Sequence, residues 1–268
     1  MNFQEITKAI QTKKNYLCVG LDTDITKLPS HLQNNPDGVI NFNKAIIEAT
    51  KDYCVSYKIN TAFYEARGSK GWEELEETFR LIPNSHFKIA DAKRADIGNT
   101  SEQYARAFFE TLKADAVTVS PYMGLDCLEP FFAYDNKFTI VLALTSNPGS
   151  IDFEQGDFGG KKLYESVIYK TAEKADKYKA MFVVGATKAE TLGDIRKIIP
   201  EHYILVPGVG SQGGSLSAVS QFGMTDNIGL LVNNSRQIIY ASQGEDFAEA
   251  AAKQAKLHAQ EMAMFVKK

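Results

Sequence analysis

The stretch HFKIADAKRADIGNTS, residues 86–101, begins as an apolar run and then places two aspartates, a lysine and an arginine within six positions. Charges are costly to bury unless they are paired or hydrogen-bonded, so a strand that ends in this way has reached either solvent or an active site. Period-two alternation puts Phe87, Ile89, Asp91 and Lys93 on one face of the strand and small alanines on the other. The pattern predicts a buried strand that packs helices on its alanine face and carries two charged groups at its exit.

Short runs of the same character recur along the whole chain. Seven more predicted strands lie at 16–22, 55–63, 116–122, 139–146, 181–186, 203–210 and 228–235. Helical patterns separate them, for example at 71–82, 100–112, 162–178, 188–199 and 245–265. Eight β/α units in a chain of this length match the (β/α)8 barrel, for which about 250 residues is typical. We therefore predict an α/β protein, a single (β/α)8 TIM-barrel domain over residues 1–268, with a doubly wound open sheet as the alternative.

The composition favours a small-molecule partner. The 268 residues are 44% hydrophobic and 24% charged, with a formal net charge of −3. Because there is no basic excess, neither nucleic acid nor an anionic membrane surface has general electrostatic support as a partner. The first 15 residues lack the apolar segment of a signal peptide, and no later apolar run reaches the roughly 18 residues of a membrane span. We expect a cytoplasmic protein.

The cysteines do not indicate a disulfide framework or a metal centre. Cys18, Cys54 and Cys127 are odd in number and widely separated, and no CxxC pair occurs. Free cysteine packs as a small hydrophobic residue. We expect all three to be reduced core residues.

Polar residues collect where the predicted strands end. In a (β/α)8 barrel the active site is built at the carboxyl ends of the strands. The strand ends and the positions just beyond them supply Asp22, Lys58, Asn60, Asp91, Lys93, Thr145, Ser146 and Arg236. Lys58 belongs to the strand that precedes Asp91 and Lys93, so it is expected to reach both of them at the barrel mouth.

The charges that follow the 86–93 strand have two interpretations. The simpler one is a strand end that frays into a solvated turn, because most charge runs are exposed. The other is an ordered site in which Asp91, Lys93, Lys58 and Asp96 alternate in sign and hold one another in their charged forms. A lysine held in this way can donate a proton or stabilise a nearby carbanion.

Two later segments indicate a phosphate-binding site. PGVGSQGGS, residues 207–215, is a glycine-rich turn whose backbone N–H groups can surround an anion. NNSRQ, residues 233–237, offers Arg236 as a charged clamp. The loops after the seventh and eighth strands are the usual phosphate site of this barrel. Each segment alone is weak support, and their joint placement is what favours a phosphorylated ligand.

At these residues the chain resembles the orotidine 5′-phosphate decarboxylase family. The resemblance is carried, in the family's order and over nearly the whole chain, by GLDTD (20–24), YKIN (57–60), the D-x-K-x-x-D motif of DAKRADI (91–97), LTSNPG (144–149), PGVGSQGG (207–214) and NSRQIIYA (234–241). The insertion NPGSIDFEQGDFGG, residues 147–160, is similar to the longer bacterial branch of the family. One departure is Ser235, where many members have glycine before the phosphate-binding arginine.

The resemblance implies a reaction and the residues that carry it. Orotidine 5′-phosphate would lose CO2 to give uridine 5′-phosphate (UMP), the last step of de novo UMP synthesis, with no metal, flavin or other cofactor. Lys93 would stabilise and protonate the carbanion left at C6, with Asp91 beside the departing carboxylate. Lys58 and Asp96 would complete the charge network. The substrate-binding residues implied are Asp22 and Lys58 at the ribose hydroxyls, Ser146 at the pyrimidine, Gln212, Gly213 and Arg236 at the phosphate, and Thr100.

The resemblance also implies a homodimer in which Asp96 reaches the partner's site. Asp96 lies three residues beyond Lys93, just before a helix expected to start near Asn99, so it has left the strand face that aims Asp91 and Lys93 inward.

Three alternatives stay open. Sugar-phosphate decarboxylases and hexulose-phosphate synthases of the same superfamily share the D-x-K-x-x-D motif, but they carry a magnesium-binding glutamate where this chain has Lys58. A Schiff-base aldolase built on Lys58 or Lys93 is a weaker possibility. A catalytically silent nucleotide-binding barrel is the third, because fold alone does not fix function.

Overall fold

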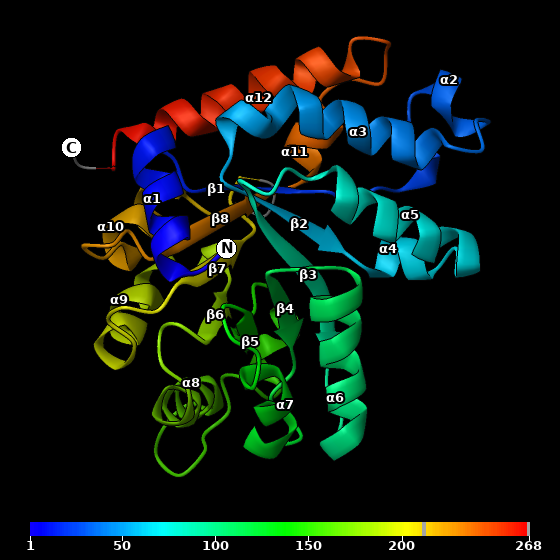
Figure 1. The fold of residues 1–268 in the computed structure, drawn as a ribbon. Helices are drawn as coiled ribbons and strands as arrows, with labels where there is room; N and C mark the ends of the chain where they lie inside the picture. Colours follow the sequence, from blue (N-terminus) through cyan, green and yellow to red (C-terminus); the bar gives the residue numbers. More distant parts are fainter. Residues whose placement is uncertain (211–212, 267–268) are drawn as a thin grey trace.

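The structure is a computed structural model that describes residues 1–210 and 213–266. Eight parallel strands form a closed barrel in the order of the sequence (Figure 1). The strands are β1 (Leu17–Gly20), β2 (Ser56–Asn60), β3 (Phe87–Arg94), β4 (Ala116–Val119), β5 (Phe138–Leu144), β6 (Ala180–Val184), β7 (Ile204–Pro207) and β8 (Leu230–Asn234). The predicted (β/α)8 barrel is confirmed, and the open sheet is wrong.

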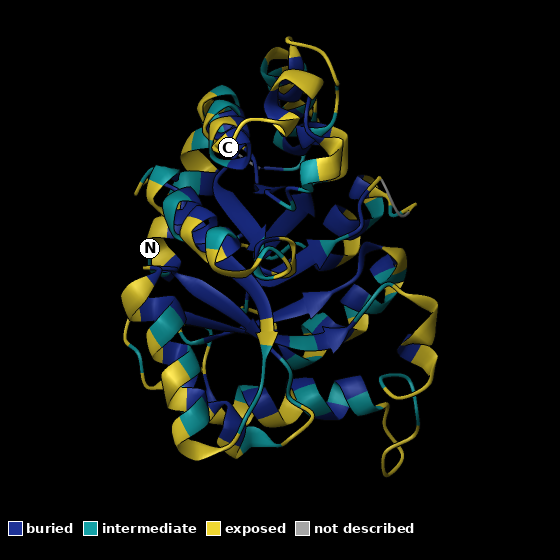
Figure 2. Cartoon of the chain, turned by 90° about the vertical axis from the view of Figure 1, so that its right-hand side faces the viewer, coloured by how far each residue is buried: buried dark blue, intermediate teal, exposed yellow. Residues whose placement is uncertain are grey.

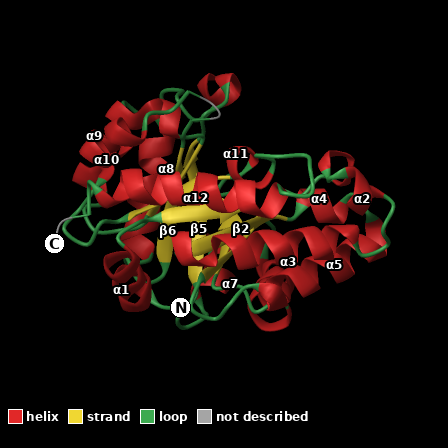
Figure 3. Ribbon diagram, turned by 90° about the horizontal axis from the view of Figure 1, so that it is seen from above, coloured by secondary structure: helices red, strands yellow, loops and turns green. Residues whose placement is uncertain are grey.

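Helices surround the strands, as the view from above shows (Figure 3). They are α1 (Phe3–Lys13), α2 (Ser30–Gln33), α3 (Gly38–Thr50), α4 (Ala62–Glu65), α5 (Gly68–Leu81), α6 (Gly98–Arg106), α7 (Glu129–Phe132), α8 (Leu163–Lys174), α9 (Ala189–Ile198), α10 (Leu216–Gly223), α11 (Arg236–Ile239) and α12 (Phe247–Ala263). Helix α6 continues into a π-helical segment at Ala107–Thr111, and it begins one residue before the expected Asn99.

Several strands stop earlier than the sequence pattern predicts. β1 ends at Gly20, two residues before Asp22, and β5 ends at Leu144, just before Thr145. Parallel strands keep their ladder only while both neighbours continue, so the polar residues that follow lie in the first turns above the barrel. The shorter strands therefore place the polar side chains at the mouth rather than in the wall.

The barrel wall is buried on both faces, which explains why its strands have nearly continuous apolar sequences. Figure 2 shows the strands as largely buried, with exposed residues on the outer faces of the helices and in the loops. Inside the barrel the rings of Phe87 and Phe138, from alternate strands, meet edge to face with centroids 5.5 Å apart. Outside it, α12 lies along α3 (Figure 1), where Phe42 and Phe247 stack with centroids 5.1 Å apart.

Helix α1 covers the amino-terminal end of the barrel. The ring of Phe3 packs against Tyr203, just before β7, with centroids 5.1 Å apart. The Lys13 ammonium donates to the backbone carbonyls of Lys51 and Cys54 at 2.7 and 2.8 Å. The amino end is therefore closed, and access to the barrel is left to the opposite end.

All three cysteines are buried and free. Burial raises the pKa of Cys18 and of Cys54 to about 12, so these thiols stay protonated and unreactive at neutral pH. Within the described ranges, the structure contains no helix that is both long and apolar enough to cross a membrane.

Candidate active site

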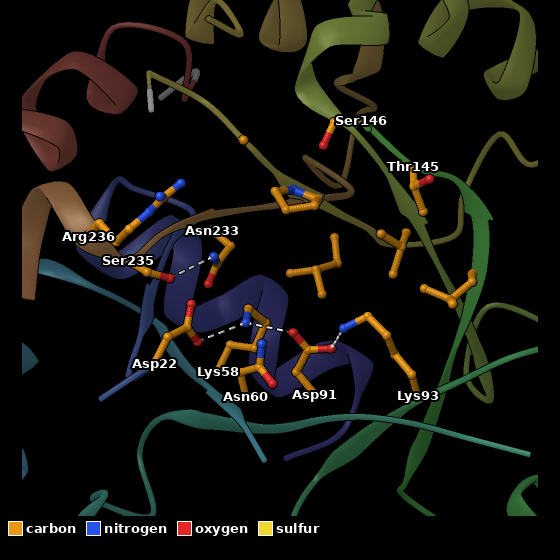
Figure 4. A pocket seen from close by; sticks show the side chains of 15 residues that line it. Asp22, Lys58, Asn60, Asp91, Lys93, Thr145, Ser146, Asn233, Ser235 and Arg236 are labelled. Atoms are coloured by element: carbon orange, nitrogen blue, oxygen red, sulfur yellow. Dashed lines mark hydrogen bonds and ion pairs between the residues drawn. The ribbon is translucent and has the colours of Figure 1, made fainter. Parts of the chain in front are cut away.

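A cavity opens at the carboxyl end of the barrel, among the turns that follow the strands (Figure 4). All eight polar residues expected at the strand ends line it, namely Asp22, Lys58, Asn60, Asp91, Lys93, Thr145, Ser146 and Arg236. They come from β2 and β3 and from the turns after β1, β5 and β8. The structure thus gathers around one cavity groups that lie more than 200 residues apart in the chain.

Four charged groups form a row across the floor of this cavity (Figure 4). The Lys58 ammonium donates to Asp22 Oδ1 at 3.3 Å and to Asp91 Oδ2 at 2.7 Å. The Lys93 ammonium donates to the other oxygen, Asp91 Oδ1, at 2.5 Å. Lys58 and Asp91 are buried, whereas the Lys93 side chain is 48% exposed. Asp91 is therefore held from both sides, and Lys93 is the most exposed member of the row.

The row keeps its charges because opposite signs alternate along it. Burial alone would raise the pKa of Asp91, but the ammonium groups of Lys58 and Lys93 outweigh it and hold that pKa well below its usual range. Burial alone would lower the pKa of Lys58, but Asp22 and Asp91 raise it above its usual value. At neutral pH, Asp91 is a carboxylate and Lys58 an ammonium.

The backbone of β3 changes at the D-x-K-x-x-D motif. The register with β4 shifts between Ala90 and Arg94, and Lys93 has a left-handed backbone with φ of +48°. Simple strand alternation, expected from the sequence, therefore does not extend to Lys93. Its side chain still meets Asp91 and lines the cavity.

Thr118 of β4 lies beneath this irregularity. The backbone N–H of Lys93 donates to Thr118 Oγ1 at 2.9 Å, and the Thr118 hydroxyl donates to Asp91 Oδ1 at 3.1 Å. One buried hydroxyl thus contacts both catalytic candidates of β3.

The opposite side of the cavity is formed by the start of α11. Arg236 and Ser235 project there from the end of β8 (Figure 4). The Asn233 amide donates to Ser235 Oγ at 3.2 Å. Ser235 fits because Gly20 faces it: a Cβ at Gly20 would lie 1.8 Å from Ser235 Oγ. The residue that departs from the family pattern is thus accommodated by a glycine on the neighbouring strand.

The turn after β5 is held by the insertion that follows it. Glu154 Oε2 accepts from the backbone N–H of Thr145 at 2.7 Å, and the Thr145 hydroxyl donates to Glu154 Oε1 at 2.9 Å. Ser146, the next residue, lines the cavity. The carboxylate of the insertion therefore fixes the turn from which Ser146 projects.

Three predicted site residues lie away from this cavity within the chain. Asp96, Thr100 and Gly213 are absent from the described residues that line it. Asp96 Oδ1 accepts from the backbone N–H of Ile97 at 2.8 Å. The backbone N–H of Gly213 donates to the Gly210 carbonyl at 3.1 Å, inside its own turn, rather than toward the cavity. Gln212 lies outside the described residues.

Thr118, Glu154 and Asn233 were not predicted from the sequence. Thr118 had a usable signal, since it is the polar residue of the strand AVTV, next to the strand of the D-x-K-x-x-D motif. Glu154 had none, because its contact depends on how the 147–160 insertion folds back over β5.

Comparison with known proteins agrees with the sequence motifs. Residues 15–253 match the profile described as "Orotidine 5'-phosphate decarboxylase / HUMPS family". Relatives named orotidine 5′-phosphate decarboxylase occur in Flavobacterium johnsoniae, 54% identical over 99% of this chain and 98% of that protein, and in Christiangramia forsetii, 53% identical over the full length of both.

Solved structures show the same architecture. The OMP decarboxylase of Leishmania donovani is 34% identical, with a TM-score of 0.83 over 98% of this chain and 99% of that one. The UMP synthase of the same organism is 36% identical, with a TM-score of 0.84 over 97% of this chain and 57% of that longer chain. From its motifs, its barrel and these likenesses, the chain belongs to the orotidine 5′-phosphate decarboxylase / HUMPS family.

Proposed function

We propose that this enzyme decarboxylates orotidine 5′-phosphate to UMP and CO2, with the row of charges at the barrel mouth as its catalytic apparatus. The observation that carries the proposal is the row itself: Lys93, within reach of a ligand, is held 2.5 Å from Asp91, which in turn is held 2.7 Å from Lys58. The close relatives named for this activity support the substrate.

The chemical step needs a cation where negative charge develops. The bond between C6 and the carboxylate breaks, CO2 leaves, and the electron pair stays on C6. The Lys93 ammonium stabilises this carbanion and transfers a proton to it, which gives UMP, and solvent then returns a proton to the amine. No oxidant or reductant is needed, because the proton replaces CO2 without a change in electron count.

Asp91 and Lys58 hold this acid in place. Asp91 lies beside the departing carboxylate and orients the Lys93 ammonium. Lys58 keeps Asp91 ionised and well ordered. Such preorganised charges cost no rearrangement when the reaction occurs.

The rest of the cavity binds the substrate. Asp22 and Lys58 contact the ribose hydroxyls, Ser146 contacts the pyrimidine, and Arg236 clamps the phosphate. Figure 4 supports this division, since Arg236 and Lys93 project from opposite sides of the cavity. Gln212, Gly213 and Thr100 complete the proposed contacts. For Gly213 this requires its turn to open, because its N–H is bonded within the turn.

Lys58 disfavours the magnesium-dependent alternative. Those relatives place a glutamate at this position to bind the metal. Here a buried ammonium lies between two carboxylates instead, and it would repel a divalent cation.

We further propose a homodimer in which Asp96 serves the partner's site. Within its own chain, no ion pair of the described residues joins Asp96 to Lys58 or Lys93. Large apolar side chains are exposed at the same mouth, in the turns after β3, β4 and β5: Ile97 is 60% exposed, Tyr122 81% and Phe153 69%. Exposed apolar clusters of this kind mark interaction surfaces. A second copy of the chain that covers them would bring its own Asp96 to the cavity.

The dimer is tested by mixing two inactive variants, Lys93→Ala and Asp96→Ala, under conditions of subunit exchange. If Asp96 acts on the partner, one site of each mixed dimer collects both defects and the other is intact, so roughly a quarter of wild-type activity returns. If activity stays absent despite proven exchange, Asp96 serves its own chain.

The reaction is tested with purified enzyme, orotidine 5′-phosphate and excess EDTA. We expect loss of substrate absorbance and stoichiometric UMP at a rate that EDTA does not change. Activity that EDTA abolishes and magnesium restores would instead indicate the metal-dependent branch of the family.

A further inference from the structure

The hydroxyl of Thr118 is the one polar group of β4 that faces the catalytic motif. Thr118 is 1% exposed, and its neighbours along β4 are the apolar Val117 and Val119. Its oxygen takes part in two hydrogen bonds with fixed directions: it accepts from the Lys93 N–H and donates to Asp91 Oδ1. The donor and acceptor capacity of a single threonine therefore links the two residues on which the proposed reaction depends.

The first of these bonds secures an unfavourable backbone. Lys93 has φ of +48°, a conformation that residues with a Cβ rarely adopt. At the register shift between β3 and β4 the Lys93 N–H has left the regular ladder, and Thr118 Oγ1 accepts it in place of a strand carbonyl. A residue with a left-handed backbone persists at a functional site when several surrounding contacts hold that backbone in place.

The second bond fixes the partner of the Lys93 ammonium. Asp91 Oδ1 accepts from Lys93 Nζ and from Thr118, while Asp91 Oδ2 accepts from Lys58. Without the Thr118 hydroxyl, Asp91 would be held only by the two lysines, one of which must move its proton during the reaction.

We infer that Thr118 is a positioning residue for the chemical step: it holds the backbone of Lys93 and the carboxylate of Asp91 so that the ammonium points at C6. It does not touch the substrate itself, since Thr118 is not among the described residues that line the cavity. Reacting groups must be placed to within a fraction of an ångström, so a small shift of Lys93 lowers the rate without weakening binding. The inference rests on the proposed decarboxylation.

The test compares three variants with the wild type. Thr118→Val keeps the shape and removes the hydroxyl, and Thr118→Ser keeps the hydroxyl and removes the methyl group. Thr139→Val is the matched control, because Thr139 of the adjacent strand β5 is fully buried and its hydroxyl has no partner among the described residues. Each variant is assayed for kcat, KM and UMP affinity, and the hydrogen-exchange rate of the Lys93 amide is measured.

We expect Thr118→Val to lower kcat by roughly 10- to 100-fold, the effect of losing hydrogen bonds to a charged group, with UMP affinity within about twofold of wild type. Its Lys93 amide should exchange faster. Thr118→Ser should recover most of kcat and of the amide protection, and Thr139→Val should change neither.

The inference is overturned if Thr118→Val keeps the kcat of Thr139→Val, if Thr118→Ser is as slow as Thr118→Val, or if UMP affinity falls in step with kcat. Failure of the proposed reaction is distinguishable from these outcomes. It would appear as absence of turnover in the wild type, and the amide exchange of Lys93 would still report whether Thr118 holds it.

Discussion

At the carboxyl end of the barrel the buried ammonium of Lys58 lies between two carboxylates, whereas at the amino end the guanidinium of Arg196 lies among backbone carbonyls. Arg196 donates to the carbonyls of Gly223, Ile199, His202 and Gly229 at 2.6 to 3.2 Å. Burial lowers the pKa of Arg196 to about 9, while Asp22 and Asp91 raise that of Lys58. Lys58 is buried and Arg196 half-buried, yet their pKa values move in opposite directions.

The difference comes from the kind of partner. Carbonyl dipoles satisfy the hydrogen bonds of a cation but supply no full negative charge, so the cost of burial prevails. Carboxylates supply that charge, and they leave the row at the mouth able to act on a ligand. In barrels of this type the amino-terminal face serves stability and the carboxyl-terminal face serves catalysis.

The largest effect is expected for Lys93→Ala. Removal of the acid should lower turnover by at least ~1,000-fold, because both charge stabilisation and proton transfer are lost. The free energy of unfolding should change little, since the side chain is half exposed. Turnover assays and urea denaturation on the same sample check both statements, and near-normal turnover would mean that another group is the acid.

For Arg196→Met at the amino end we expect a loss of stability without a loss of turnover. Four backbone carbonyls lose their donor, so the free energy of unfolding should fall by about 2 kcal/mol. The kcat of the folded enzyme should stay within about twofold of wild type. Arg80→Met on the exposed face of α5 is the matched control and should alter neither quantity. A large loss of kcat in Arg196→Met would show that the amino end of the barrel also contributes to catalysis.

A smaller effect is expected at the contact between Gly20 and Ser235. A methyl group at Gly20 would lie 1.8 Å from Ser235 Oγ, so Gly20→Ala should displace the turn that carries Arg236 and weaken UMP binding roughly tenfold. Calorimetric titration with UMP measures this. Addition of Ser235→Gly should restore affinity, and if it does not, the two residues are not coupled.

The smallest effect is expected in the pH dependence of stability, through His86 at the amino end. Burial, with Lys13 nearby, lowers the pKa of His86 to about 4, so between pH 6.5 and 4 the unfolded chain binds more protons at this position than the folded one. The free energy of unfolding should therefore fall as the pH drops through this range, by roughly 1 kcal/mol per pH unit from His86. The row of charges at the barrel mouth should not contribute to this loss of stability. The pKa of Asp91 is held well below its usual range, so its charge is lost only at lower pH.

Urea denaturation at several pH values measures this dependence. The free energy of unfolding should fall less steeply with decreasing pH in His86→Gln than in the wild type. Identical slopes would mean that other groups cause the loss of stability.

The sequence predicted the barrel because its eight strands are short apolar runs separated by amphipathic helices, and all eight were found. It also predicted that Asp22, Lys58, Asp91, Lys93, Ser146 and Arg236 would meet, since they share the carboxyl ends of the strands. Other features depend on the register between strands and on how loops fold back. The left-handed Lys93, its contact with Thr118 and the clamp of Glu154 on Thr145 therefore became visible only in the structure.

The central claim is that an ammonium group at position 93 performs the chemistry, and chemical rescue tests it most directly. Lys93→Cys is treated with 2-bromoethylamine, which rebuilds an ammonium on a side chain of nearly the same length as lysine. The native cysteines are fully buried and should not react. We predict that turnover rises at least ~100-fold after aminoethylation and does not rise after treatment with neutral iodoacetamide. A protein shown by mass spectrometry to be aminoethylated once, at position 93, yet still inactive, would contradict the account.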